Sequence, residues 1–92
     1  MKVRWFAPAV DDLDHLHSYI SQEEPADAEA EVQRVLDAAG RLRTHAAKGR
    51  PGRVAGTREL RVEPYIVIYR VKGAAVQVLR VLHAACNWPT TL

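Results

Sequence analysis

The spacing of apolar residues changes character about halfway along the chain, and this change limits the folds open to it. Up to position 46 apolar residues recur at helical spacing, whereas after position 57 they crowd into short runs rich in β-branched and aromatic side chains. Between the two parts lies a segment, 49–56, whose glycines and proline predict a loop. We therefore expect a helical unit followed by a sheet.

The helical part is divided by a break at residues 21–24. One helix is expected to begin at Pro8 and to end near Ile20, and a second to begin at Pro25, because proline is favoured in the first turn of a helix. The apolar stripe of the second helix continues to Ala46. Two helices joined by so short a break predict a helical hairpin.

Four segments have the composition of strands: residues 2–6, 57–62, 65–71 and 75–83. The last three are separated by very short connections, including a turn at residues 72–74, which predicts a meander of neighbouring strands. The order β-α-α-β-β-β predicts an α+β fold, with a small antiparallel β-sheet that carries the helical hairpin on one face.

The length of 92 residues suits one small domain, so we expect residues 1–92 to form a single unit. The single cysteine, Cys86, cannot form an internal disulfide. No apolar stretch approaches the roughly 20 residues that span a bilayer, and acidic residues follow Lys2 and Arg4 where a signal peptide needs an apolar segment. We expect a cytoplasmic protein without a membrane partner.

Charge is divided unevenly along the chain. Residues 1–40 hold three basic and nine acidic side chains, whereas residues 41–92 hold ten basic and two acidic ones. Ten of the thirteen basic residues are arginine, whose planar guanidinium suits phosphates and carboxylates. The second part is expected either to present a positive surface to an anionic partner or to be neutralised by the acidic part within the fold.

Neither a metal nor a nucleotide cofactor is expected. His15 and His17 are two residues apart, which directs them to different sides of a helix, and no cysteine pair exists to complete a metal site. The segment 49–56 lacks the Gly-Lys-Ser/Thr ending of a phosphate loop and leads into a strand. Cys86 and His83, three residues apart in a terminal tail, do not make a catalytic triad.

Arginines on the predicted strands are stronger candidates for function. Alternation places Arg58 among aliphatic neighbours and puts Glu59 and Arg61 together on the opposite face. In the next strand, Arg70 shares its face with two isoleucines. Because a buried unpaired arginine is costly, each arginine is expected to form a structural ion pair or to lie at the rim or on an open face of the sheet.

The placement of Arg80 relative to Arg70 depends on the register of the last hairpin. A pairing of Val71 with Ala75 puts both arginines on one face, whereas a pairing of Val71 with Val76 separates them. The sequence leaves both registers open. Simple alternation groups Arg80 with three aliphatic residues, Val76, Val78 and Leu82.

Short motifs follow one another over nearly the whole chain. They are Trp5, Asp11-Asp12-Leu13, Ser18-Tyr19-Ile20, Pro25, Ala28, Gly49-Arg50-Pro51-Gly52-Arg53, Gly56-Thr57-Arg58-Glu59-Leu60, residues 65–71, residues 79–83 and Trp88-Pro89. In this order and spacing the chain resembles the RelE/ParE superfamily of bacterial toxins from type II toxin–antitoxin modules. The resemblance implies the β-α-α-β-β-β fold that periodicity predicts.

The resemblance also implies one of two activities. RelE-like members cut messenger RNA on the ribosome, which needs cationic and acid–base side chains around the scissile phosphate, and ParE-like members poison DNA gyrase. RelE-like ribonucleases commonly have an arginine where this chain has Ile66, directly after Tyr65, and a basic and aromatic run where it has residues 84–87. Both departures favour a ParE-like gyrase inhibitor that is not an enzyme.

Two other interpretations remain open. For a ribonuclease the candidate catalytic residues are Arg58, Glu59, Arg61, Arg80 and His83. His83 also suits a packing role beneath Trp88 at the end of its strand. The third interpretation is a relative that binds nucleic acid without further activity, because the second part of the chain is strongly basic.

Every interpretation within the superfamily implies a cognate antitoxin and a toxin–antitoxin hetero-oligomer. An antitoxin tail can lay amphipathic helices on the helical hairpin and add a strand to the sheet edge, and an acidic tail would suit the basic part. DNA gyrase, or the ribosome with messenger RNA, is the further partner. The expected contact residues are Leu13, Leu16, Tyr19, Ile20, Arg58, Arg61, Arg70, Arg80 and Trp88.

Overall fold

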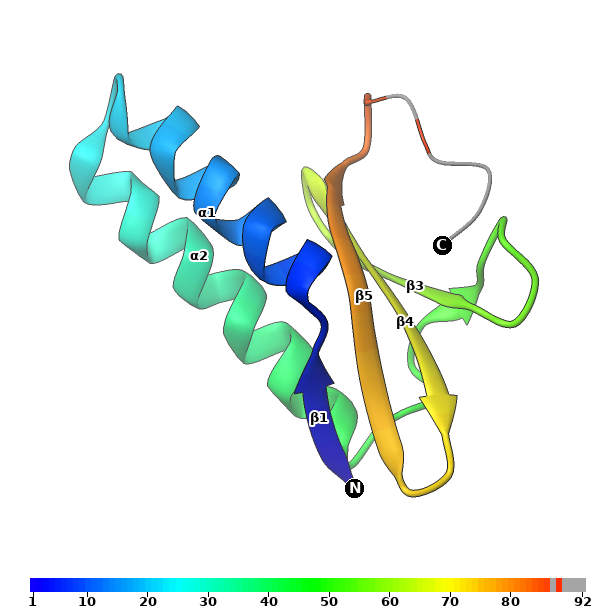
Figure 1. The fold of residues 1–92 in the computed structure, drawn as a ribbon. Coiled ribbons are helices and arrows are strands. Elements are labelled where there is room, and N and C mark those ends of the chain that lie inside the picture. Colours follow the sequence, from blue (N-terminus) through cyan, green and yellow to red (C-terminus); the bar gives the residue numbers. More distant parts are fainter. Residues whose placement is uncertain (87, 89–92) are drawn as a thin grey trace.

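The computed structural model describes residues 1–86 and 88, so Asn87 and Pro89 of the expected C-terminal motifs lie outside the described residues. A helical hairpin and a five-stranded sheet form two layers (Figure 1). The hairpin consists of α1 (Ala7–Ser21) and α2 (Pro25–Gly40), followed by the short 3-10 helix η1 (Arg41–Arg43). The strands are β1 (Lys2–Trp5), β2 (Arg50–Pro51), β3 (Arg58–Val62), β4 (Tyr65–Lys72) and β5 (Ala75–His83).

The strand order in the sheet is β1-β5-β4-β3-β2. Strands β3, β4 and β5 form the predicted antiparallel meander, but β1 pairs with β5 in parallel, so the sheet is mixed. The parallel pair follows from the topology, because the hairpin α1–α2 provides the long crossover that parallel strands need. The α+β class, with the helical hairpin against one face of the sheet, is confirmed.

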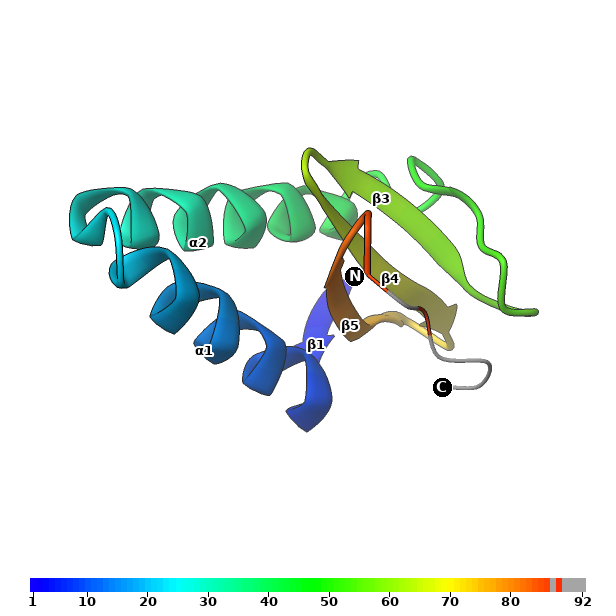
Figure 2. The same cartoon turned by 90° about the horizontal axis from the view of Figure 1, so that it is seen from above.

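The helices lie on one side of the sheet (Figure 2), and the main core lies between the two layers. Its members include Leu13 of α1, Val35 of α2 and Val67 of β4. Both prolines occupy the first turns of their helices as predicted, although α2 ends at Gly40 rather than continuing to Ala46. No described helix is long and apolar enough to cross a membrane.

The hairpin β4–β5 has a bulge that changes which residues share a face. Val71 pairs with Val76, but Tyr69 pairs with Val78 and Ile68 with Arg80, so one extra residue of β5 is left between two pairs. An extra residue reverses the alternation beyond it.

Arg80 therefore lies on the face of Arg70 and Leu82, and the prediction that groups it with Val76 and Val78 is wrong. The expectation that this register separates the two arginines is wrong for the same reason. Neither follows from counting residues in a turn, because the sequence does not mark the bulge.

The connection that leads to β3 is fastened to the sheet by Tyr69, which is completely buried. The Tyr69 hydroxyl accepts a hydrogen bond from the Gly49 N–H at 2.9 Å and donates one to the Ala46 carbonyl at 2.6 Å. A Cβ on residue 49 would lie 2.7 Å from the tyrosine ring, so glycine permits the close approach of the backbone. Within the expected loop, residues 50–51 form the additional short strand β2.

Replacing Tyr69 with phenylalanine should lower the free energy of unfolding by about 2 kcal/mol, because a buried donor and a buried acceptor both lose their partner. Urea unfolding would measure the loss. Tyr65→Phe is the matched control: Tyr65 is only partly buried, and within residues 1–86 and 88 its hydroxyl forms no hydrogen bond. Equal losses in the two variants would contradict the assigned role of the Tyr69 hydroxyl.

Candidate functional site

The five residues predicted for a ribonuclease site lie in separate environments. Arg58 shares the helix-covered face with Leu60 and donates a hydrogen bond to the Gly49 carbonyl at 2.7 Å. Glu59 and Arg61 lie on the opposite face, here called the open face, as alternation predicts. The structure thus divides this neighbouring trio between two faces.

His83 ends β5 on the helix-covered side, opposite Tyr65, with the two ring centroids 5.8 Å apart and the rings edge to face. It does not pack beneath Trp88, which lies on the open face against Ile66. Glu59 and His83, the carboxylate and the imidazole of the predicted set, therefore project from opposite faces of the sheet. The structure does not bring them around one phosphate.

Glu59 is buried, and its carboxylate is already engaged. Its Oε2 accepts the backbone N–H of Arg53 at 2.8 Å and lies 3.4 Å from Nε of the same residue. Its Oε1 lies 3.7 Å from Nη2 of Arg50. A carboxylate held in this way orders the loop between β2 and β3.

Arg80 forms an ion pair with Asp12 of α1. Its Nε and Nη2 donate to the Asp12 carboxylate at 2.7 and 3.0 Å, and Oδ2 of Asp12 also accepts the backbone N–H of Val81 at 2.9 Å. The hydrogen bond to Asp12 is the main reason that the pKa of Arg80 is raised. Asp12 thus covers the part of the β5 edge that extends beyond the pairing with β1, which ends at Trp5.

The acidic part of the chain does not neutralise the basic part by direct pairing. Of the five salt bridges among residues 1–86 and 88, only Arg80–Asp12 joins residues 1–40 to the remainder. Arg61 pairs with neighbouring Glu63 in solvent, and Arg70 donates to the Gln77 side chain at 2.6 Å. Much of the basic charge therefore stays available to an anionic partner.

Trp88 covers part of the open face. It packs against a second small apolar cluster formed by Ile66, Ile68 and Leu82. The guanidinium carbon of Arg53 lies 3.5 Å from the centre of its ring, a cation–π contact. Trp88, one of the predicted contact residues, therefore contacts the loop between β2 and β3 through Arg53.

An apolar groove of about 510 Å³ lies between α1 and the ends of β4 and β5. Leu16 and Tyr19 line it from the helix, and Tyr65, Leu82 and His83 from the sheet. Tyr19 is 78% exposed, which is unusual for a large aromatic side chain. The groove therefore brings Leu16 and Tyr19, two of the predicted contact residues, close to His83 at the end of β5, which was predicted as a catalytic residue.

The other two predicted residues of α1 lie apart from this groove. Leu13 belongs to the core, and Ile20 lines a neighbouring hollow of about 250 Å³ whose rim is acidic. Tyr65 borders both hollows, and partial burial, followed by the charge of Glu31, raises the pKa of its phenol. The four residues of α1 that were predicted as one contact surface therefore lie in different places: the core, the groove and the neighbouring hollow.

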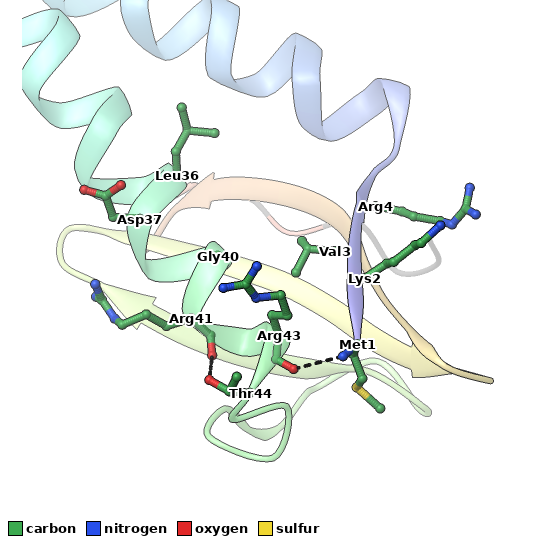
Figure 3. Close-up of a pocket in the computed structure, with 10 residues that line it drawn as sticks. All are labelled: Met1, Lys2, Val3, Arg4, Leu36, Asp37, Gly40, Arg41, Arg43 and Thr44. Carbon is green, nitrogen blue, oxygen red and sulfur yellow. Dashed lines mark hydrogen bonds between the residues drawn. The ribbon is translucent and has the colours of Figure 1, made fainter.

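A larger hollow, of about 970 Å³, lies between β1 and the end of α2 (Figure 3). Lys2, Arg4, Arg41 and Arg43 border it, and Asp37 is its one acidic lining residue. None of the predicted site residues lines it. The sequence does not indicate this basic surface, because its cations come from two distant segments, residues 2–4 and 41–43, which come together only in the folded protein.

Among residues 1–86 and 88 there is no group of three or more histidine, cysteine or acidic side chains suited to a metal ion. The described part of the chain offers an apolar groove beside α1, a basic hollow beside β1, and an open sheet face with arginines around Trp88. These surfaces suit the binding of other macromolecules.

Comparison with known proteins gives a consistent assignment. Residues 3–88 match the family model described as the ParE toxin of the type II toxin–antitoxin system parDE. The chain is 39% identical to a candidate toxin, Y4kP, of Sinorhizobium fredii over 99% of this chain and 96% of that protein. It is 35% identical to toxin RelE2 of Caulobacter vibrioides over 91% of this chain and 96% of the relative.

Two solved structures share the fold. A chain of the chromosomal ParDE system from P. aeruginosa superposes with a TM-score of 0.85 at 32% identity, covering 90% of this chain and 95% of that one. A chain of the toxin–antitoxin complex RelBE2 from Mycobacterium tuberculosis superposes with a TM-score of 0.65 at 30% identity, covering 89% and 88%. Both neighbours come from toxin–antitoxin systems.

Proposed function

We propose that this chain, which belongs to the ParE toxin family of type II toxin–antitoxin systems, inhibits DNA gyrase by binding it and is neutralised by a cognate antitoxin. The observation that carries the proposal is the separation of Glu59 from His83 on opposite faces of the sheet. A ribonuclease of the RelE type needs its acid, base and cations around one phosphate.

Ile66 gives independent support. A nuclease arginine would stand at this position, but here the residue is buried in the apolar cluster beneath Trp88. Arg58 is similarly committed to a backbone carbonyl, and Arg80 to Asp12. Two of the three arginines that a cleavage site would use are therefore engaged in holding the fold.

In this proposal the toxin is a binding protein. Gyrase passes through a state in which its DNA is cut and covalently held. A ligand that binds this state more tightly than the resealed state increases its population, which needs no chemistry from the ligand. Breaks then accumulate because resealing is disfavoured.

The antitoxin is proposed to bind the apolar groove beside α1. An amphipathic helix or extended tail would lay apolar side chains against Leu16 and Tyr19, which is a common mode of recognition. Covering this groove would also shield apolar surface that a free protein exposes to water.

Purified toxin should abolish supercoiling of relaxed plasmid by gyrase, and an equimolar antitoxin should restore it. In a translating extract the toxin should leave messenger RNA intact. Ribosome-dependent cleavage that disappears in the variants Arg80→Ala and His83→Ala would contradict the proposal and establish the ribonuclease interpretation instead.

A further inference from the structure

The loop between β2 and β3 combines a buried carboxylate with two exposed arginines. We propose that Glu59 is a positioning residue, which presents Arg50 and Arg53 to the phosphates of duplex DNA. This inference deepens the proposed function, on which it rests for the identity of the nucleic acid, because the toxin would meet gyrase while gyrase holds DNA.

The geometry ties both arginines to one group. Arg50 stands directly opposite Glu59 in the β2–β3 pair, and Arg53 is held by its backbone N–H and by its Nε. The Glu59 side chain is 3% exposed, whereas those of Arg50 and Arg53 are 57% and 49% exposed. One buried anion therefore lies within ion-pair distance of two solvent-facing cations.

Backbone contacts make the loop rigid independently of these side chains. The Gly52 N–H donates to the Thr57 carbonyl at 2.8 Å, and the Thr57 hydroxyl donates to the Val54 carbonyl at 2.6 Å. A Cβ on Gly52 would collide with the Thr57 hydroxyl, so the residue has to be glycine. The two arginines thus start from a fixed backbone.

Stability alone does not account for the cluster. Burying a carboxylate beside partly solvated cations gains little, because desolvation offsets the attraction. What the arrangement supplies is orientation: within residues 1–86 and 88, the side chains of Arg50 and Arg53 have Glu59 as their only hydrogen-bonding or ion-pair partner. Since each guanidinium has five N–H donors, most of them remain for an external anion.

The surroundings favour a polyanion over a single small anion. Arg53 also stacks on Trp88, which extends the cluster onto the open face. Arg61, Arg70 and Lys72 lie on the same face, on β3 and β4. Several cations spread over one face of adjacent strands suit the repeated phosphates of a nucleic-acid backbone, which guanidinium groups can bind bidentately.

The variant Glu59→Gln separates positioning from simple electrostatics. It removes a negative charge from the site, so electrostatics alone predicts tighter binding to DNA. The proposal predicts the opposite: affinity for a fluorescein-labelled duplex of mixed sequence, measured by anisotropy at low salt, should fall about tenfold because two arginines lose their fixed geometry. An affinity equal to or above that of the wild-type protein would overturn the proposal.

A double variant, Arg50→Ala with Arg53→Ala, tests the same site without touching a buried group. The slope of log affinity against log salt concentration should decrease in magnitude by about two, one for each lost phosphate contact. The matched control is Arg41→Ala with Arg43→Ala, which removes the same charge beside the basic hollow and should leave the slope within error. Equal slopes in the two double variants would refute the assignment.

Two further readouts separate this inference from the proposed function and from misfolding. Antitoxin binding by all variants should resemble that of the wild-type protein, which shows that they are folded. The double variant of Arg50 and Arg53 should unfold at a lower temperature, because it leaves the Glu59 carboxylate buried with the Arg53 N–H as its remaining partner. If the wild-type toxin leaves gyrase unaffected, the proposed function fails, whereas the DNA measurements still decide the role of Glu59. If the wild-type toxin poisons gyrase and Glu59→Gln does so equally well, the positioning role is wrong.

Discussion

Replacing Asp12 with alanine should lower the free energy of unfolding by about 3 kcal/mol and the melting temperature by about 15 °C. The reason is that the Asp12 carboxylate accepts three hydrogen bonds, two from Arg80 and one from the backbone N–H of Val81. Its removal leaves a partly buried guanidinium and a strand-edge amide without a partner. This loss of stability is at the lower end of the range for broken buried ion pairs, because the Arg80 side chain stays partly exposed to water.

The adjacent exposed residue provides a control, since Asp11→Ala removes the same charge from the same helix. That variant should change stability by less than about 0.5 kcal/mol. Arg80→Ala should cost less than Asp12→Ala, because Asp12 would keep its bond to Val81. Equal melting temperatures for the Asp11 and Asp12 variants would show that the ion pair does not join α1 to the sheet.

Replacing Tyr19 with alanine should weaken antitoxin binding about 30-fold, because an exposed tyrosine in the groove beside α1 has the character of an interface hot spot. Titration calorimetry with the cognate antitoxin would measure the effect. Adding Leu16→Ala should weaken binding further, since both side chains line the same groove.

Val10→Ala is the matched control for this surface. Val10 is an exposed apolar residue on the same helix, but it does not line the groove. Its replacement should leave antitoxin affinity within about twofold of the wild-type value. A Tyr19 variant that binds as tightly as the Val10 variant would place the antitoxin elsewhere on the toxin.

The two long helices and the longer strands were predictable because each leaves a local signature. Helical spacing and the two prolines located α1 and α2, and the density of β-branched residues located β4. Alternation also placed Arg58 and Glu59 correctly on opposite faces of β3. These features depend on neighbours along the chain, which a sequence displays directly.

Features that depend on distant partners were not predictable. The parallel pairing of β1 with β5 is set by the crossover through the hairpin, and the bulge that moves Arg80 leaves no mark in the sequence. The candidate site shows the same limit. Glu59 was predicted as a candidate acid from its residue type, but its burial and its contact with Arg53 exist only once β2 pairs with β3.

The most direct test of the proposed function is plasmid cleavage by gyrase in the presence of purified toxin, with the reaction stopped by detergent and digested by protease before electrophoresis. We predict that linear plasmid accumulates as toxin is added and that it disappears when antitoxin is added first. Gyrase that produces no linear plasmid and supercoils normally at saturating toxin would contradict the central claim.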